Sequence, residues 1–453
     1  MAVEITRTPA SNGNQKTWTW SAWVKKATVG MGSGDYQMLF TANYGNGYRY
    51  TDIYFREDYL EIFGGVYNTS SSSISINVST NRVFRDPSAF YHLVIAVDTT
   101  QSTAADRVKV YVNGVQETSF KNYQGSTVVY PDQNADTFMN VTTTQNRIGA
   151  SSGSYPFKGL MTHIHFIDGT AYPASTFGET DSTSGIWKPK TAPSVTYGTN
   201  GFFLKFENAG NLDLDSSTNA HTFATSGTLI QNVDTPSNNF ATLNSLTANC
   251  TLSNGNNTWL GTQSGYEHSS ATLGVSSGKW YWEVKPNGPC GAMGVTDFNW
   301  QFKRRGSIIY ASSGYAWIYE GNGYVSHNSY GDIASNYSSY TSSDIIGVAL
   351  DLTNNKLHFS KNGVFEASSN PATNTNGISI DAPSSLPSGF YSPLAADLCS
   401  AVVGGADFNF GSGFFGTTAV ASANADGNGF GAFEYAVPSG YYALNTKNIK
   451  EFG

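Results

Sequence analysis

The sequence predicts an all-β fold made of two antiparallel, jelly-roll-like β-sandwich domains in tandem. Charged residues make up only 13% of the 453 residues, whereas aromatic residues make up 14% and glycine occurs 47 times. This composition favours short strands joined by polar turns, and no segment shows the apolar period of a helix. The same pattern of strands and turns also occurs twice, in residues 93–117 and 345–366. One sandwich around each copy is therefore expected; the length alone suits three domains or two such sandwiches equally.

Residues 345–366 show this pattern most clearly. Val348, Leu350 and Leu352 occupy alternate positions, as in a strand with one buried face. Asn362-Gly363 then provides the dipeptide that tolerates positive φ at both central positions of a type I′ turn. The upstream copy has the same alternating apolar strand and closing dipeptide, in Val108, Val110, Val112, Asn113 and Gly114. Each copy predicts a meander of three strands.

The first module begins at Trp18. The preceding residues 1–17 are polar and rich in turn formers, so they are predicted to be an N-terminal arm. The stretches WTWSAWVK, YHLVIAVD, VKVYVNGV and NRIGASSGSYPFKGLMTHIHFIDGTAYPASTF then follow one another along the chain. In this order they resemble the laminin G-like, concanavalin A-type lectin domains. The resemblance implies that residues 18–210 form a sandwich of that family.

The second module follows a connector. Residues 211–248 are predicted to be a linker, because DTPSNNFATL has the proline and paired asparagines of a domain boundary. In residues 249–411, the stretches GKWYWEV, DIIGVALDLTNNKLHFSKNGVF and GFYSPLAAD resemble the SPRY domain. The middle strand, GAMGV, departs slightly from that family's pattern. Residues 412–453 form a C-terminal segment rich in glycine and alanine.

The connector and the end of the chain carry a further resemblance. The runs DTPSNNFATLN and FEYAVPSGYYALNTKN resemble parts of tailed-bacteriophage proteins that join a laminin G-like module to a SPRY module. The resemblance implies a tail-fibre or surface-appendage protein that presents its sandwiches to a host-surface glycan or protein. It also implies other virion proteins as partners, a symmetric homo-oligomer, and location in the virion after synthesis in the host cytoplasm.

Charge, hydropathy and cysteine content exclude several classes of protein. The net charge of −8 argues against a nucleic-acid partner, since phosphate binding needs a basic face. No run approaches the ~20 apolar residues of a membrane span, and the N-terminus lacks the features of a signal peptide. Cys250, Cys290 and Cys399 are widely spaced and are interpreted as buried free thiols, without a disulfide framework or a zinc site.

Enzymatic activity is not predicted. Concanavalin A-type sandwiches include glycoside hydrolases, whose two carboxylates must lie close together, but no E-x-D-x-E run occurs here. The nearest candidates, Glu57 and Glu61 with Asp58 between them, are interpreted as solvated charges of a hairpin turn. His163 and His165, at i and i+2 of one strand, are interpreted as structural rather than as metal ligands. A polysaccharide depolymerase and a purely structural capsid or tail decoration stay open as alternatives.

Calcium is the one cofactor with candidate ligands. Asp213, Asp215 and Asn219 cluster in a loop that resembles the acidic loop common beside such lectin domains. Their oxygen atoms suit a hard cation. The same residues also form an ordinary Asx-turn sequence, so both interpretations stay open.

Aromatic residues in loops are the candidate binding residues. Tyrosine and tryptophan beside asparagine, serine and glycine combine rigid stacking surfaces with adaptable hydrogen-bonding groups, a mixture that suits sugars. The alternative is that these aromatic residues only cap the ends of the sandwiches. The candidate residues are Tyr48, Tyr50, Trp300, Tyr315, Trp317 and Tyr319.

Overall fold

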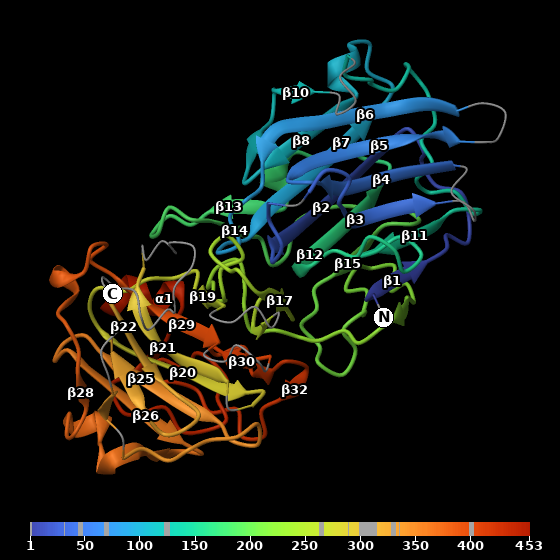
Figure 1. Cartoon of the computed structure of the whole chain (residues 1–453). Coiled ribbons are helices and arrows are strands. Elements are labelled where there is room, and N and C mark those ends of the chain that lie inside the picture. The colour runs from blue at the N-terminus through green and yellow to red at the C-terminus, as the bar shows by residue number, and fades with distance from the viewer. Residues whose placement is uncertain are drawn as a thin grey trace. The chain divides into compact units, whose positions relative to one another are not determined.

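The computed structural model describes residues 2–30, 32–43, 49–67, 72–121, 127–261, 267–288, 290–298, 315–327, 332–334, 336–397 and 403–453. Within these ranges the chain is nearly all β, which confirms the predicted fold class. It divides into two compact units, unit 1 (Met1–Gln231) and unit 2 (Asn232–Gly453) (Figure 1). No helix of the described part is long and apolar enough to span a bilayer.

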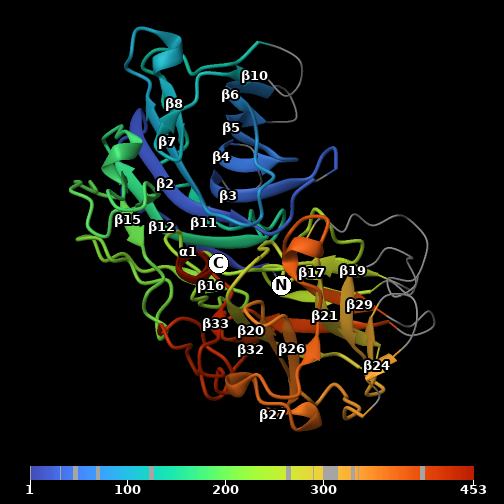
Figure 2. The same cartoon turned by 90° about the vertical axis from the view of Figure 1, so that its left-hand side faces the viewer.

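Unit 1 is a sandwich of two antiparallel sheets (Figures 1 and 2). The eight-stranded sheet contains, in spatial order, β10 (Phe120–Lys121), β6 (Ser72–Val83), β5 (Tyr59–Tyr67), β4 (Arg49–Arg56), β3 (Tyr36–Asn43), β11 (Gln145–Ile148), β1 (Glu4–Arg7) and β16 (Ala224–Ser226). The six-stranded sheet contains β15 (Phe202–Leu204), β12 (Gly159–Asp168), β2 (Thr17–Lys26), β7 (Tyr91–Asp98), β8 (Val108–Val112) and β9 (Val115–Gln116). A separate hairpin pairs β13 (Gly178–Thr180) with β14 (Trp187–Pro189).

The core of unit 1 lies between these sheets, as the period-2 patterns require. Trp18 and Trp20 of β2 are fully buried, and the Trp20 ring stacks on Phe40 of β3 at 6.4 Å. Ile53 and Phe55 of β4 add to the same cluster. Burying each such side chain contributes about 1.5–3 kcal/mol, so the alternating strands specify the sandwich.

Unit 2 is a second sandwich. Its larger sheet has β17 (Thr251–Ser253), β18 (Thr258–Leu260), β30 (Gly405–Asn409), β20 (Lys279–Pro286), β25 (Ile346–Asp351), β26 (Lys356–Lys361) and β27 (Val364–Phe365), with β28 (Ile378–Ser379) beside β26 and β33 (Tyr442–Ala443) beside β20. The smaller sheet has β19 (His268–Ser270), β29 (Tyr391–Asp397), β21 (Gly291–Asp297), β22 (Ala316–Tyr319), β23 (Val325–His327) and β24 (Asp332–Ala334). β31 (Phe414–Phe415) pairs with β32 (Thr418–Ala419), and α1 (Thr446–Phe452) ends the chain.

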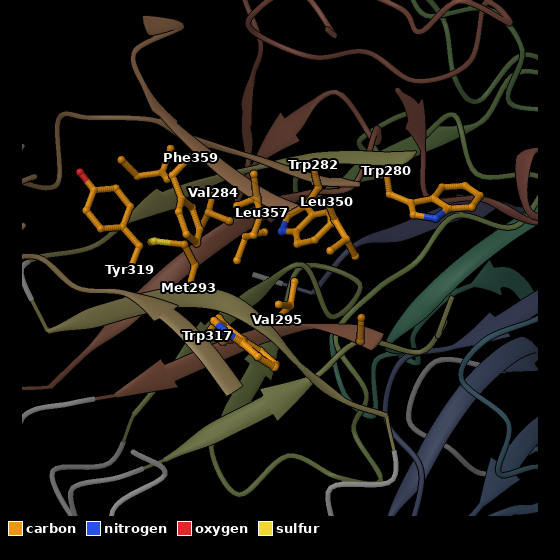
Figure 3. Close-up of a cluster of buried hydrophobic side chains, with 14 of the residues drawn as sticks. Trp280, Trp282, Val284, Met293, Val295, Trp317, Tyr319, Leu350, Leu357 and Phe359 are labelled. Carbon is orange, nitrogen blue, oxygen red and sulfur yellow. The ribbon is translucent and has the colours of Figure 1, made fainter. Parts of the chain in front are cut away.

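Side chains from both sheets of unit 2 meet in one core (Figure 3). Trp280 and Trp282 alternate on β20 and are fully buried, as their spacing predicts. Trp317 and Tyr319 of β22 enter the same core from the other sheet. Figure 3 shows the side chains of β20 and β26 directed toward those of β21 and β22.

Both predicted meanders are confirmed. In unit 1, β7, β8 and β9 pair in sequence order, and Asn113 and Gly114 have φ values of 49° and 85°. In unit 2, β25, β26 and β27 do the same, with 50° at Asn362 and 81° at Gly363. Positive φ at both positions is what the Asn-Gly dipeptide permits.

The predicted domain boundaries need three corrections. Residues 1–17 are not a free arm, because β1 pairs with β11 and β16 and Ile5 is buried in the core. The predicted linker 211–248 is divided between the units, since it supplies β16 to unit 1 and the buried Phe240 to unit 2. The predicted C-terminal segment 412–453 is also part of unit 2, where it supplies β33 beside β20.

The C-terminal segment is held by Glu283, a carboxylate of β20 with no exposed surface. One oxygen accepts the backbone N–H of Tyr435 at 2.8 Å, and the other accepts the backbone N–H of Glu434 at 2.8 Å. The Tyr281 hydroxyl and the Asn409 amide donate further hydrogen bonds. Burial nevertheless raises the pKa of Glu283 to about 7.

This raised pKa predicts the pH dependence of unit 2. Between about pH 4.5 and 7 the unfolded chain has released the Glu283 proton while the folded chain retains it. The free energy of unfolding should therefore fall as pH rises through this window, by roughly 3 kcal/mol from this group. Glu283→Gln should remove that component, which urea unfolding of both proteins at several pH values would measure. An unchanged pH slope in the variant would contradict the assignment.

The cysteine prediction was wrong for Cys290, which is disulfide-bonded. Its partner lies outside the described residues, as does the predicted residue Cys399. Cys250 is a free thiol, as predicted, and burial raises its pKa to about 12. Wide spacing along the chain does not exclude a pair, because residues distant in sequence become neighbours only on folding.

Candidate functional site

The strongest candidate site is the outer face of the eight-stranded sheet in unit 1, the face directed away from the core. Alternation along β4 and β5 defines it, since Ile53 and Ile62 point into the core. The residues that alternate with these along each strand point the opposite way. On β4 and β5 these outward residues are Tyr50, Asp52, Tyr54, Arg56, Tyr59, Glu61 and Phe63.

Aromatic rings line this outer face. Tyr50 and Phe63 stack with their ring centroids 5.7 Å apart and their planes at 22°. Tyr54 lies against Tyr36 of β3 at 5.6 Å, and the Arg56 guanidinium lies over the Tyr36 ring at 5.3 Å. Tyr50, Phe63 and Tyr36 are only half-buried. The face therefore offers apolar ring surfaces that a ligand can reach.

Two carboxyl groups lie among these rings. Asp52 pairs with Phe63, and Tyr54 pairs with Glu61, so Asp52 and Glu61 are diagonal neighbours on adjacent antiparallel strands. Such positions are separated by about 7–8 Å along the sheet. Burial raises the pKa of Asp52 to about 7, and the Thr41 hydroxyl partly opposes this shift. Burial also raises the pKa of Glu61.

Glu61 has neighbours that favour its ionised form. The hydroxyls of Tyr54 and Ser79 and the positive charges of Arg56 and Lys121 oppose the rise in its pKa. The Arg56 Nη1 atom is 3.9 Å from a Glu61 carboxylate oxygen. A carboxyl group of raised pKa beside a second one is an arrangement used in acid–base chemistry.

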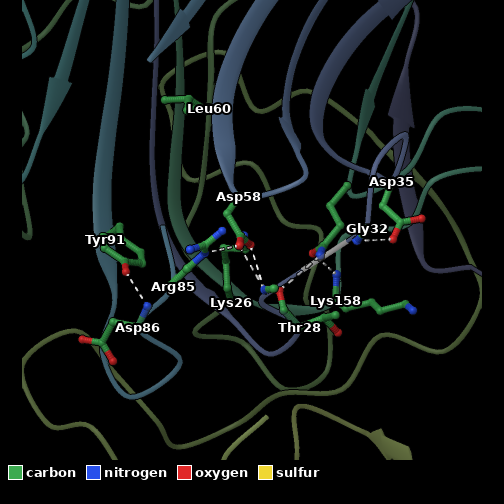
Figure 4. Close-up of polar contacts among 12 residues, drawn as sticks. Lys26, Thr28, Gly32, Asp35, Asp58, Leu60, Arg85, Asp86, Tyr91 and Lys158 are labelled. Atoms are coloured by element: carbon green, nitrogen blue, oxygen red, sulfur yellow. Dashed lines mark hydrogen bonds and ion pairs between the residues drawn. The ribbon is translucent and has the colours of Figure 1, made fainter. Parts of the chain in front are cut away.

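The prediction that the hairpin charges are solvated was wrong for Asp58 and Glu61. Glu61 has no exposed surface, and Asp58 is 1% exposed. Asp58 instead receives the Lys26 ammonium at 3.1 Å and the Arg85 guanidinium at 2.6 Å (Figure 4). It also accepts the backbone N–H of Gly30 at 3.0 Å. Asp58 therefore ties the β4–β5 turn to Lys26 at the end of β2.

The predicted binding aromatics have different positions. Tyr48 and Trp300 lie outside the described residues, whereas Tyr50 belongs to the outer face. Tyr315 is half-buried and packs against the core of unit 2. Trp317 and Tyr319 are 1% and 0% exposed in β22, so the prediction that they lie in surface loops was wrong. Their alternate spacing was the signal of a strand.

Asp215, one of the three predicted calcium ligands, organises the local backbone instead. Its Oδ1 atom accepts the backbone N–H groups of Phe203 and Ser217, both at 2.9 Å. Its Oδ2 atom accepts the N–H of His221 at 2.8 Å. Burial lowers the pKa of the nearby Arg7 guanidinium, and the negative charge of Asp215 partly opposes this shift.

The other two predicted ligands point elsewhere. Asp213 accepts the Thr225 hydroxyl at 2.7 Å. Asn219 donates its side-chain amide to the carbonyls of Gly198 and Gly201, both at 2.8 Å. No group of three or more His, Cys, Asp or Glu side chains in the described ranges is placed to hold a metal. The Asx-turn interpretation therefore describes this loop better than the calcium interpretation.

His163 and His165 of β12 pack against neighbouring side chains rather than facing a metal site. The His165 ring stacks on Phe203 at 3.8 Å, and its Nδ1 atom shares a 2.9 Å hydrogen bond with the Tyr197 hydroxyl. His163 lies at an irregularity in the pairing with β2, where its φ is 48°. Burial lowers the pKa of both imidazoles. These contacts agree with the structural interpretation.

Two family models match parts of this chain. A family model described as the concanavalin A-like lectin/glucanases superfamily matches residues 3–175, and the SPRY domain model matches residues 279–375. A search of curated proteins found no match. Among solved structures, the SPRY domain of human HERC1 is 20% identical, with 37% of this chain and 96% of that chain covered and a TM-score of 0.30. Stonustoxin is 21% identical, with 37% of this chain and 27% of that chain covered and a TM-score of 0.28. By the two family models, the chain carries a laminin G-like domain of the concanavalin A-like superfamily followed by a SPRY domain.

Proposed function

We propose that this chain is a virion structural protein of a tailed bacteriophage that binds a host-surface glycan through the outer face of its eight-stranded sheet. The virion role is supported by the resemblance of the connector and the C-terminal run. The glycan-binding role is supported by one geometric observation, the half-buried Tyr50–Phe63 stack beside Asp52.

The chemistry of that face suits a sugar. A pyranose ring has apolar C–H faces and a rim of hydroxyl groups, so it needs flat apolar surfaces next to hydrogen-bonding groups. The Tyr50–Phe63 stack supplies the first, and the carboxyl group of Asp52 supplies the second. Because regular strands hold these side chains, the face is formed before a ligand arrives.

Removing one ring of the stack tests the glycan-binding role. Tyr50→Ala should weaken binding about tenfold, or ~1.4 kcal/mol, as measured on a host polysaccharide that the wild-type chain retains. Tyr111→Ala is the matched control, since Tyr111 is a half-buried tyrosine of β8 in the other sheet. Thermal melts of both variants would show that they remain folded. Equal affinity of Tyr50→Ala and wild type would contradict the placement of the site.

A polysaccharide depolymerase is the second candidate, and the raised pKa of Asp52 on the aromatic face favours it. A carboxyl group with a pKa of about 7 is suited to donate a proton to a glycosidic oxygen. Release of reducing ends from host polysaccharide, abolished in Asp52→Asn, would establish this function. Binding without any release would leave the non-enzymatic role.

The purely structural alternative makes a different prediction. A capsid or tail decoration would be found on the particle but would retain no host glycan. Labelling the chain on purified particles locates it, and glycan retention by the same preparation separates decoration from adhesion. Light scattering of the purified chain would test the proposed homo-oligomer.

A further inference from the structure

We infer that the outer face of the eight-stranded sheet selects uncharged sugars over sugars that carry carboxylate groups, and that Asp52 sets this selectivity. The inference rests on the proposed glycan-binding role and goes beyond it by naming the class of ligand. It depends on where Asp52 lies, which charges surround it, and which hydrogen bond its carboxyl group can accept from a sugar.

Asp52 occupies the middle of the candidate face. It pairs with Thr41 of β3 on one side and with Phe63 of β5 on the other, so the three residues form one row across the sheet. Along β4 it has Tyr50 two positions before it and Tyr54 two positions after it. A sugar stacked on Tyr50 and Phe63 would therefore place a hydroxyl group over Asp52.

The Asp52 side chain is only partly buried, so its carboxyl group can be reached from this face. Its Oδ1 atom is buried and is out of reach of a ligand. A sugar hydroxyl that donates to the reachable part of the carboxyl group would form a charge-assisted hydrogen bond. A sugar carboxylate has no proton to donate at neutral pH and could not form this bond.

Electrostatic repulsion by Asp52 also favours uncharged sugars over carboxylate sugars. The positive charges of this face favour the ionised form of Glu61. Arg56 lies 3.9 Å from its carboxylate, and Lys121 also opposes the rise in its pKa. No positive charge of the described part opposes the rise in the pKa of Asp52 to about 7, and only the Thr41 hydroxyl does so. Above pH 7 Asp52 is thus a poorly solvated negative charge, and a uronate placed over it would meet like-charge repulsion.

The test uses matched ligands. The affinity of the intact chain would be measured at pH 8 for neutral polysaccharides. It would then be measured for the same polymers after oxidation of their primary hydroxyls to carboxylates. The wild-type chain should prefer the neutral form by about tenfold or more. Asp52→Asn, which keeps the shape and removes the charge, should reduce this preference to about twofold or less. Asp106→Asn, an exposed aspartate of the same unit, should leave it unchanged.

Acidification provides a second measurement on the unmodified protein. At pH 5 Asp52 should be protonated while a uronate remains ionised, so the wild-type preference should shrink toward that of Asp52→Asn. Glu61 also titrates on this face, and retention of the pH effect in Asp52→Asn would assign it to Glu61 and overturn the inference. Equal binding of both polymer forms at pH 8 would overturn it too, while the glycan-binding role would stand. No retention of either form would contradict the glycan-binding role itself.

Discussion

Replacing Asp58 with alanine is expected to lower the free energy of unfolding of unit 1 by about 3–5 kcal/mol. Lys26 and Asp58 are 0% and 1% exposed, and their ion pair measures 3.1 Å (Figure 4). Removing the carboxylate leaves the Lys26 ammonium buried without that partner and frees the Gly30 N–H group. Urea unfolding of wild type and Asp58→Ala would measure the loss.

Two further variants separate the cost of leaving a buried charge unpaired from the cost of losing an exposed ion pair. Arg85 also contacts Asp58, at 2.6 Å, but its side chain is 57% exposed. Arg85→Ala should therefore cost only about 0–1 kcal/mol. Replacing Lys26 with methionine in the Asp58→Ala background should restore part of the stability, because it removes the unpaired charge. If Asp58→Ala unfolded within about 1 kcal/mol of wild type, the buried pair would not have the expected role.

Trp317→Ala is expected to destabilise unit 2 by about 3–5 kcal/mol, because it opens a large cavity in a packed core. The Trp317 ring is 1% exposed and stacks on His327 at 4.1 Å, with Tyr391 at 5.6 Å on another side (Figure 3). Because the sequence pattern had marked Trp317 as a binding residue, this variant decides between the two interpretations. A stability loss with unchanged glycan affinity supports a core role.

Tyr324→Ala is the matched control for Trp317→Ala. Tyr324 lies in the same stretch of chain but is 36% exposed, so its removal should change the free energy of unfolding by less than about 0.5 kcal/mol. A Trp317→Ala variant that was as stable as Tyr324→Ala and bound glycan poorly would contradict the core assignment.

The sequence predicted the parts of the fold that are local. The Asn-Gly meanders were identifiable because period-2 alternation and turn chemistry are properties of neighbouring residues. β1 was missed because its four residues show no pattern of their own and are ordered by pairing with Ile148 and Thr225, far along the chain. The C-terminal segment was missed for the same reason, since Tyr442 pairs with Trp280.

The candidate site was only partly visible in the sequence. Tyr50 was selected, and alternation along residues 49–63 does contain the signal that Asp52 and Glu61 share a face with it. Closely spaced carboxylates within one strand are the usual sequence signal of such a site, whereas Asp52 and Glu61 lie on two adjacent strands. The ion pair of Lys26 with Asp58 could not have been predicted, because it depends on how β2 lies against the β4–β5 turn.

A crystal structure of the chain with a fragment of the polysaccharide that it retains would test the proposed site most directly. We predict density for a sugar ring against Tyr50 and Phe63, with a hydroxyl group within hydrogen-bonding distance of Asp52. Density for the sugar at unit 2 alone, with the outer face of the eight-stranded sheet empty, would contradict the proposal.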